Sequence, residues 1–383
     1  MSSKVFFYFL LCLVPTSLYA QDSLDNGRLL DMYQSGRFAE AARYMEALYP
    51  DSQKSESVWK GLGYAHQMSG NYVDAEKAYL KLYEQDSTSL STLISLGSIN
   101  AKRRKTQEAY DFYSKALALD SSNISIYQRL SEIEYGRNRI LDAYELLMKA
   151  HRINPANADV AYNLAMISIT LRKSAEADSI LATTLAFDPE NRHLLFGKAV
   201  ALEKLQRYND AIAVCQTLLD LGSDSLEVFQ VLGPLHFYKK DYEKCLKVMK
   251  WVEGASSDLS EGNMFIMGVS YAWTDNRALG LEYIDRAIEL GISPSMGRYY
   301  AEKGRIYQVA NQYADAVAAY KQGLNYNDDA LSSYNVALIY DYYLNKPKES
   351  LAFYKKFVEI NTAEVNQDIS DFVKGRIEEL EGP

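Results

Sequence analysis

Few side chains in this sequence have the types and spacing that catalysis or metal binding would need. Its 383 residues include four histidines, at positions 66, 151, 193 and 236, and three cysteines, at positions 12, 215 and 245. The histidines are more than 40 residues apart, so no two of them can form a metal pair on one helix face. Zinc-protease, phosphate-loop, nucleophile-elbow and EF-hand strings are absent. We therefore expect no enzyme, no cofactor and no metal site.

Aromatic side chains are the unusual group, and their chemistry is that of binding. The sequence has 31 Tyr, 13 Phe and 3 Trp. Such side chains offer a large, rigid contact area, and Tyr and Trp add a polar group. The formal charge is −9, and there is no run of five like charges, which argues against nucleic-acid binding. A protein or peptide partner is the prediction, and its identity is left open.

The first twenty residues have the order of a secretory signal peptide. Lys4 precedes an apolar run from Val5 to Val14, Pro15 ends the run, and a polar stretch follows Ala20. The run is shorter than the roughly 20 residues that a spanning helix needs. We expect residues 1–20 to be removed and the chain to be exported without membrane insertion. An uncleaved anchor is the alternative, and the cleavage point itself is not fixed.

Helical patterns recur every 34 residues, and they define the elements that must position the aromatic side chains. In residues 57–87, apolar residues at helical spacing are interrupted by the turn residues Gly70-Asn71 and then resume. Small residues return at equivalent positions: Gly63, Gly97, Ala165, Ala199, Gly233, Gly268, Gly304 and Ala337 in the first segment, and Ala75, Ala109, Ala143, Ala177, Ala211 and Ala316 in the second. About ten copies fit residues 22–361, with one extra residue around Pro347 in the last copy.

This period and these small residues at fixed offsets resemble the tetratricopeptide repeat family over nearly the whole chain. The resemblance implies an all-α fold, a right-handed α-solenoid of about ten antiparallel helix pairs. No single pair can bury its apolar face alone, so each must be stabilised by its neighbours. We expect small residues such as Gly63 to let the paired backbones approach closely. Large residues such as Tyr79 should seal each pair against the next.

The last residues, 363–383, are predicted to form a C-terminal capping helix. Ile369, Phe372, Val373, Ile377 and Leu380 are spaced by three and four, which gives one apolar stripe and a polar outer face. Such a helix can cover the exposed end of a repeat array. A docking helix for another protein is the alternative.

The resemblance also implies which side chains line the concave surface, because the first helix of each repeat faces inward. It assigns partner binding to eleven residues: Tyr64, Tyr135, Tyr162, Phe196, Phe237, Tyr238, Phe265, Trp273, Arg298, Arg305 and Tyr334. Four more fall on the same positions: Lys60, Met68, Met166 and Tyr342. The alternative for any of them is packing against neighbouring first helices. The Lys/Asn/Arg clamp of chaperone-binding members is not reproduced, since Tyr64 stands where the asparagine would follow Lys60.

Three further residues leave alternatives open. Cys215 and Cys245 stand at second-helix positions of adjacent repeats, which lie about 10 Å apart, beyond the roughly 7 Å that a disulfide spans between Cα atoms. Export would still permit a disulfide, so both a bridge and two buried thiols are possible. Pro234 falls within a first helix, where it either bends the array or is a tolerated kink.

The predicted function is a non-catalytic scaffold that holds a peptide or protein in an aromatic groove. The predicted location is the periplasm or outer membrane of a Gram-negative bacterium. A carbohydrate-binding accessory protein of an uptake or envelope assembly system is the main alternative, since aromatic faces also stack on sugar rings. An envelope assembly subunit bound along its convex side is another.

Overall fold

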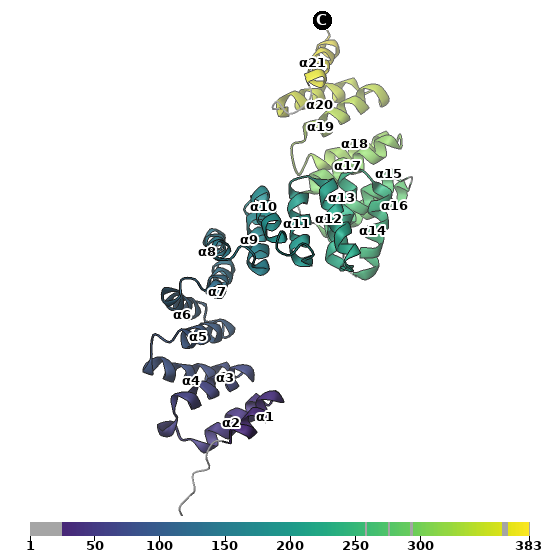
Figure 1. Cartoon of the computed structure of the whole chain (residues 1–383). Coiled ribbons are helices and arrows are strands. Elements are labelled where there is room, and N and C mark those ends of the chain that lie inside the picture. Colours follow the sequence, from purple (N-terminus) through teal and green to yellow (C-terminus); the bar gives the residue numbers. More distant parts are fainter. Residues whose placement is uncertain (1–24, 257–258, 275, 292–293, 362–366, 383) are drawn as a thin grey trace, which may run out of the picture. The chain divides into compact units, whose positions relative to one another are not determined.

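The computed structural model describes residues 25–256, 259–274, 276–291, 294–361 and 367–382. The signal peptide predicted for residues 1–20 lies outside this part of the chain. Every regular element in the described ranges is helical, and consecutive helices pack as hairpins (Figure 1). The chain divides after Asn154 into two compact units, which we describe separately.

Unit 1 contains four helix pairs. They are α1 (Asn26–Gln34) with α2 (Phe38–Leu48), α3 (Glu56–Met68) with α4 (Tyr72–Gln85), α5 (Leu90–Lys102) with α6 (Thr106–Leu119), and α7 (Ile124–Gly136) with α8 (Ile140–Ile153). A short 3-10 helix, η1 (Asp51–Gln53), connects α2 to α3. Apolar residues from adjacent pairs share each core, as the residues from α1, α2, α3 and α4 around Met45 do.

Unit 2 contains six more pairs and a final helix. The pairs are α9 (Ala158–Thr170) with α10 (Ser174–Leu185), α11 (Arg192–Lys204) with α12 (Tyr208–Asp220), α13 (Leu226–Tyr238) with α14 (Tyr242–Ala255), α15 (Glu261–Trp273) with α16 (Arg277–Leu290), α17 (Met296–Val309) with α18 (Tyr313–Gly323), and α19 (Ala330–Leu338) with α20 (Pro347–Ile360). Helix α21 (Gln367–Glu381) packs on α20 and buries Val373. Ten pairs and a final helix in the described residues confirm the predicted fold class.

Nine of the ten hairpin turns place one described residue in the left-handed backbone region, at a spacing of 34 residues within two runs. Positive φ angles occur at positions 36, 70, 104, 138, 172, 206 and 240, and again at 311 and 345. Gly occupies only the first two, and the others hold Arg, Asn, Gln or Lys. At eight of these turns the next residue donates its N–H to a carbonyl five residues back, as Asn71 does to His66 at 2.9 Å, and Lys346 donates six residues back to Tyr340 at 2.8 Å. Backbone geometry, and not residue type, therefore closes each turn.

The glycines of the first helices make room for tyrosine rings, which corrects the expected close approach of backbones. A Cβ at Gly63, Gly97 or Gly304 would lie 2.7–2.8 Å from the ring of Tyr79, Tyr113 or Tyr320, each from the second helix of the same pair. These tyrosines thus fill space within their own pair. Close approach of two backbones does occur between Gly268 and Gly280, where a Cβ on either would meet the other's carbonyl oxygen.

Two irregular positions were predicted from the sequence, Pro234 in a first helix and an extra residue around Pro347. Helix α13 continues through Pro234. The extra residue of the last pair is not at Pro347, which begins α20, but in the π-helix η2 (Ile339–Tyr343) that follows α19. A π-turn widens the helix by one residue, and it changes the direction of the side chains that follow.

Candidate functional site

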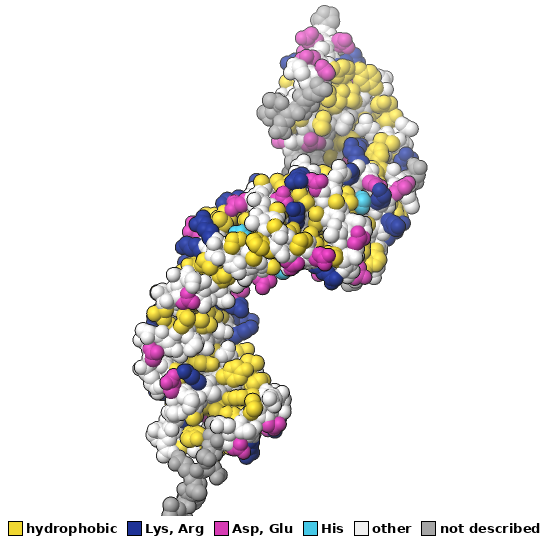
Figure 2. All heavy atoms as spheres, in the orientation of Figure 1, with side chains coloured by type: hydrophobic (Ala, Val, Ile, Leu, Met, Phe, Trp, Pro, Cys, Tyr) yellow, Lys and Arg dark blue, Asp and Glu magenta, His cyan; other side chains and the backbone are white. Residues whose placement is uncertain are grey.

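In unit 1, the predicted inner-surface tyrosines are exposed. Tyr64 is 45 % and Tyr135 is 49 % exposed. The Tyr64 ring packs edge-on against those of Tyr33 and Phe38, with centroids 5.7 and 5.9 Å apart. Figure 2 shows hydrophobic side chains gathered on the visible face near α1 and α3. Unit 1 therefore has an accessible aromatic cluster on its first two pairs.

In unit 2, the first helices α9, α11, α13, α15 and α17 pack against one another in order and form one inner layer. Tyr162 is half-buried, and its ring stacks on His193 with centroids 3.6 Å apart. Phe196 is also half-buried. Tyr238 is exposed and stacks on Tyr208 at 5.2 Å. These residues lie at separate places along the inner layer.

Phe265 is a correction to the predicted set, because it belongs to the core. Its side chain is 4 % exposed and stacks on Tyr299 with centroids 4.5 Å apart. Phe237 contacts its edge at 6.4 Å, and the exposed Arg298 guanidinium lies 5.1 Å from its centroid. The Tyr299 hydroxyl donates to Glu261 at 2.7 Å. Burial is the larger cause, and this hydrogen bond the second, that raises the pKa of Tyr299 to about 12. Phe265 thus supports Arg298 but offers little area to a partner.

Trp273 and Arg305 form a fixed pair on the inner layer. The Arg305 guanidinium lies 4.3 Å from the Trp273 ring centroid. Trp273 Nε1 donates to Glu302 Oε1 at 3.2 Å, and Arg305 Nε donates to Glu302 Oε2 at 3.0 Å. Both side chains are therefore held in place before any partner arrives, and the Arg305 charge is balanced by Glu302.

Tyr334 has a different setting, at the end of the array. It is half-buried, and its ring contacts Phe357 of α20 at 5.7 Å and Phe372 of α21 at 6.4 Å. The predicted apolar stripe of α21 faces this point, since Val373 is fully buried and Ile369, Ile377 and Leu380 pack around it. Tyr334 therefore contributes to the docking of α21.

A pocket of about 420 Å³ opens beside the Trp273–Arg305 pair. It is lined by Trp273, Arg305, Gln308, Val309, Asn311, Tyr313, Tyr320, Asn335 and Tyr343. Tyr313 and Tyr343 stack with centroids 4.1 Å apart, and Tyr343 is 55 % exposed. Sequence reasoning found Trp273 and Arg305 but missed the tyrosine pair. The extra residue of the last repeat was the signal, because the π-turn that holds it ends at Tyr343.

The pocket is polar, and its positive charge is balanced by a neighbouring carboxylate. Arg305 is its one charged lining residue in the described chain, and Glu302 pairs with it. The hydroxyl of Tyr320 donates to Gln308 Oε1 at 2.9 Å, and that of Tyr313 donates to Asn311 Oδ1 at 2.8 Å. Burial raises the pKa of Tyr320, so this phenol stays protonated as a donor. The pocket offers aromatic faces and amide groups to a neutral ligand segment.

The two cysteines among the described residues are free thiols in α12 and α14. Both Cys215 and Cys245 are buried and unbridged. Within the described residues, no group of three His, Cys, Asp or Glu side chains could hold a metal ion. None of the described helices combines the length and the apolar character needed to cross a bilayer.

Comparisons with known proteins find similarity to tetratricopeptide repeats. Residues 28–89 and 162–225 match the tetratricopeptide repeat profile, one region in each unit. A tetratricopeptide repeat protein from Parabacteroides merdae is 16 % identical, with a TM-score of 0.49 over 62 % of this chain and 94 % of that one. YrrB, described as a tetratricopeptide repeat protein with an unusual peptide-binding site, is 20 % identical, with a TM-score of 0.36 over 56 % of this chain and 93 % of that one.

A third solved structure, of the Cut9–Hcn1 hetero-tetramer, is 14 % identical, with a TM-score of 0.47 over 91 % of this chain and 95 % of that one. The search of curated proteins found no match. The profile matches fall on helix pairs whose turns repeat every 34 residues. On these grounds, residues 28–89 and 162–225 are tetratricopeptide repeats.

Proposed function

We propose that this protein is a non-catalytic scaffold that holds an extended peptide or protein segment on the inner layer of unit 2. Tetratricopeptide repeats are protein-interaction scaffolds, and the pocket beside Trp273 and Arg305 carries the proposal for this chain. Trp, Tyr and Arg dominate binding energies in protein interfaces. Because Glu302 already fixes Trp273 and Arg305, little side-chain entropy is lost when a partner binds.

The experiment compares partner capture by the full chain and by single variants. Trp273→Ala and Tyr343→Ala should each weaken capture from envelope extract by about 2 kcal/mol, or roughly 30-fold. Phe187→Ala is the matched control, because Phe187 is 65 % exposed and is not among the residues lining the pocket. Melting curves should show that all three variants remain folded. Equal capture by wild type and by both pocket variants would reject the proposal.

A carbohydrate is the second candidate ligand, and the same pocket favours it. Stacked aromatic rings next to the amides of Gln308, Asn311 and Asn335 offer a flat face and hydrogen-bond groups for a sugar ring. Oligosaccharide titrations that follow Trp273 fluorescence, with Trp59 and Trp251 replaced by Phe, separate the two candidates. Saturable quenching supports a sugar, and its absence together with peptide capture supports a protein partner.

The proposed location is the bacterial envelope, as a periplasmic or outer-membrane-associated protein. It rests on the signal-peptide pattern of residues 1–20. Fractionation of expressing cells, followed by N-terminal sequencing of the recovered protein, tests it. Recovery of the chain from the cytoplasm with residues 1–20 intact would contradict it.

A further inference from the structure

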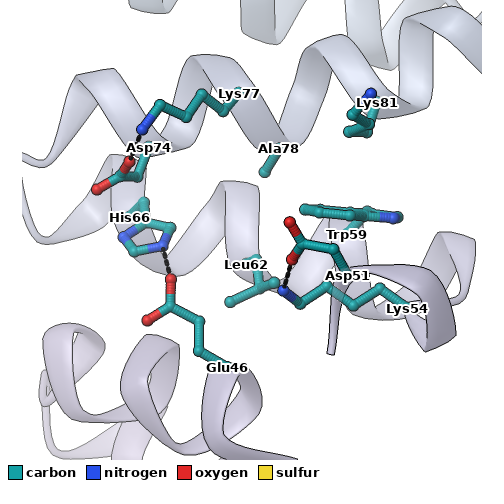
Figure 3. Close-up of a pocket in the computed structure, with 10 residues that line it drawn as sticks. All are labelled: Glu46, Asp51, Lys54, Trp59, Leu62, His66, Asp74, Lys77, Ala78 and Lys81. Atoms are coloured by element: carbon teal, nitrogen blue, oxygen red, sulfur yellow. Dashed lines mark hydrogen bonds and ion pairs between the residues drawn. The ribbon is translucent and has the colours of Figure 1, made fainter. Parts of the chain in front are cut away.

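A second cleft lies in unit 1. It has a volume of about 330 Å³ (Figure 3). Its walls come from the second helices α2 and α4, and α3 contributes Trp59, Leu62 and His66. The lining residues are Glu46, Asp51, Lys54, Trp59, Leu62, His66, Asp74, Lys77, Ala78 and Lys81. Its floor is apolar and flat, because Trp59, Leu62 and Ala78 form it.

Lys54 is the unusual residue of this cleft. Its side chain is 7 % exposed, and its ammonium lies 4.8 Å from the Trp59 ring centroid. The ammonium pairs with the carboxylate of Asp51, which is itself 82 % exposed. A cation removed from water needs a close anion, and an exposed carboxylate supplies this weakly because it stays hydrated. The setting of Lys54 therefore favours a second anion within the cleft.

Lys81 brings a further positive charge to the same place. The pKa of Asp51 is lowered, first by its hydrogen bond to Lys54 and also by the charge of Lys81. Asp51 thus lies under the influence of both amines. Lys81 pairs with the exposed Glu84 at 2.8 Å, and such a surface pair is readily exchanged. An external anion at the position of the Asp51 carboxylate would therefore meet Lys54 directly, in a cleft that Lys81 also lines.

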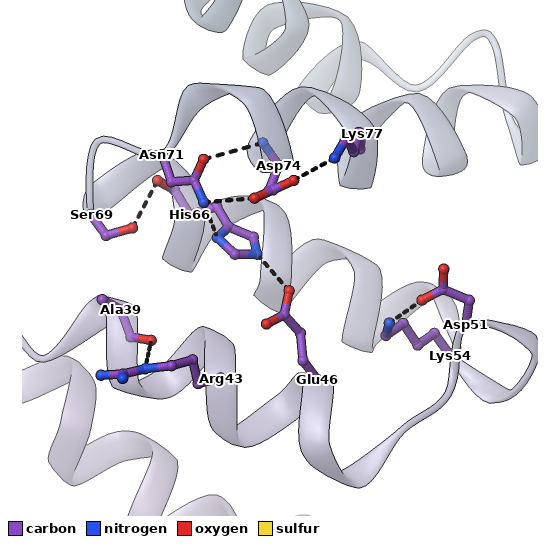
Figure 4. A network of polar contacts seen from close by, with 10 residues as sticks. All are labelled: Ala39, Arg43, Glu46, Asp51, Lys54, His66, Ser69, Asn71, Asp74 and Lys77. Atoms are coloured by element: carbon purple, nitrogen blue, oxygen red, sulfur yellow. Dashed lines mark hydrogen bonds and ion pairs between the residues drawn. The ribbon is translucent and has the colours of Figure 1, made fainter.

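The other carboxylates of the cleft are already engaged (Figure 4). His66 Nδ1 accepts from Asn71 Nδ2 at 3.4 Å, so His66 Nε2 carries the proton and donates to Glu46 Oε1 at 3.1 Å. Asp74 accepts from Lys77 at 2.7 Å and from Asn71 at 2.8 Å. These bonds hold Glu46 and Asp74 at the His66 end, away from the Trp59 and Lys54 end.

We propose that this cleft binds a small aromatic carboxylate. Its ring lies against Trp59, and its carboxylate takes the place of the Asp51 carboxylate beside Lys54, in the cleft that Lys81 also lines. The ring gains apolar contact with the floor, and the anion compensates the buried ammonium of Lys54. Asp51 is the internal competitor of the ligand, since it occupies the same amine.

Calorimetric titration of the full chain with 2-naphthoate tests the proposal, with the neutral 2-naphthamide and the anion 2-naphthalenesulfonate as parallel probes. Naphthoate should bind saturably, and naphthamide should not. If the sulfonate binds equally well, any aromatic anion suffices, and the proposal extends to that class. In a chain with Trp251 and Trp273 replaced by Phe, naphthoate should also shift the indole N–H signal of Trp59.

Variants provide two changes of opposite sign. Lys54→Met keeps the apolar stem and should weaken binding about tenfold, whereas Asp51→Asn removes the competing anion and should tighten it about threefold. Lys60→Met is the matched control, because Lys60 lies on α3 but pairs with Glu56 and is not among the residues lining the cleft. A lack of saturation up to about 10 mM would overturn the proposal. So would equal binding of the amide, or weaker binding by Asp51→Asn.

If Lys54→Met does not fold, Trp59→Leu replaces it. That variant keeps Lys54 and removes the flat ring, so binding should again be lost. Asp51 is a surface residue, so its replacement leaves the core intact. Tighter binding of naphthoate by Asp51→Asn is therefore enough to support the proposal.

Discussion

A largely buried ion pair adds to the apolar contacts that hold helix α21 to the last helix pair, and its removal should loosen the helix. Asp341 of η2 is 5 % exposed and accepts from Arg376 Nε at 2.8 Å and from Arg376 Nη2 at 2.9 Å. Tyr354 Oη donates to the same carboxylate at 3.2 Å. Replacing Asp341 with Asn removes the charge and one acceptor, and it leaves the Arg376 guanidinium without its anion.

The expected loss follows from these bonds. A hydrogen bond between charged groups contributes about 1.5–3 kcal/mol, and Asp341 and Arg376 share two. Arg376 is 27 % exposed, so water replaces part of what is lost. We therefore expect Asp341→Asn to lower the free energy of opening α21 by about 2 kcal/mol. Because end units of repeat arrays open locally, the change should be confined to α21 and its contacts.

Amide hydrogen exchange across residues 367–381 measures this opening. An effect of about 2 kcal/mol predicts roughly 30-fold faster exchange in Asp341→Asn. Glu379→Gln is the matched control, because Glu379 binds the same arginine at 2.5 Å but is 67 % exposed. Its effect should stay below about 0.5 kcal/mol. Equal exchange in the two variants would show that burial does not strengthen the Asp341 bond.

The same bond predicts a pH dependence. Arg376 lowers the pKa of the Asp341 carboxyl, chiefly by hydrogen bonding. The pair therefore stabilises α21 fully above the unfolded pKa of about 3.9, and this contribution is lost as the pH falls through the lower folded pKa. Once the exchange rates are divided by the intrinsic rate at each pH, the protection of α21 should fall in acid for the wild type. Asp341→Asn should lack this part of the fall.

Two further predictions concern the turns and the thiols. Lys240 has a φ of 60°, so Lys240→Gly should raise the free energy of unfolding by about 1 kcal/mol, measured by urea denaturation. Lys239→Gly, at a φ of −79°, should give no gain, and a gain there would contradict the role of φ. Burial raises the pKa of Cys215 to about 12 and that of Cys245 to about 11. Both thiols should resist a thiol reagent at pH 8 until the chain unfolds, and stability should fall as the pH rises above about 8.5, where unfolded thiols ionise. Rapid labelling of the folded chain would contradict their burial.

The sequence was sufficient to predict the helix pairs, because the 34-residue period reports packing that every pair repeats. Small residues at fixed offsets marked where the two helices of a pair meet. It did not reveal what fills the space above Gly97, since a glycine leaves room for a ring as readily as for a backbone. The ring of Tyr113, in the second helix of the same pair, fills this space, and the contact between Gly97 and Tyr113 is visible only in the structure.

The candidate site was predictable only in part, for a similar reason. Position in the repeat indicates that a side chain faces inward, but burial depends on which neighbour lies beside it. Phe265 is buried because Tyr299 covers it, whereas Tyr64 keeps an open face. The stack of Tyr313 and Tyr343 depends on the π-turn, which a regular period cannot predict.

The nine left-handed turn residues have a consequence for how such a chain can diverge. All nine are exposed, and Gly, Arg, Asn, Gln and Lys all occur among them. Mutation can therefore change the charge of these turn residues from neutral to basic while the fold stays the same. The Gly–Tyr contacts inside the pairs have no such latitude, since a methyl group at Gly63 would collide with an aromatic ring. Related chains should accordingly vary in charge along the turns and conserve the glycine–tyrosine pairs, a contrast that an alignment of homologues would expose.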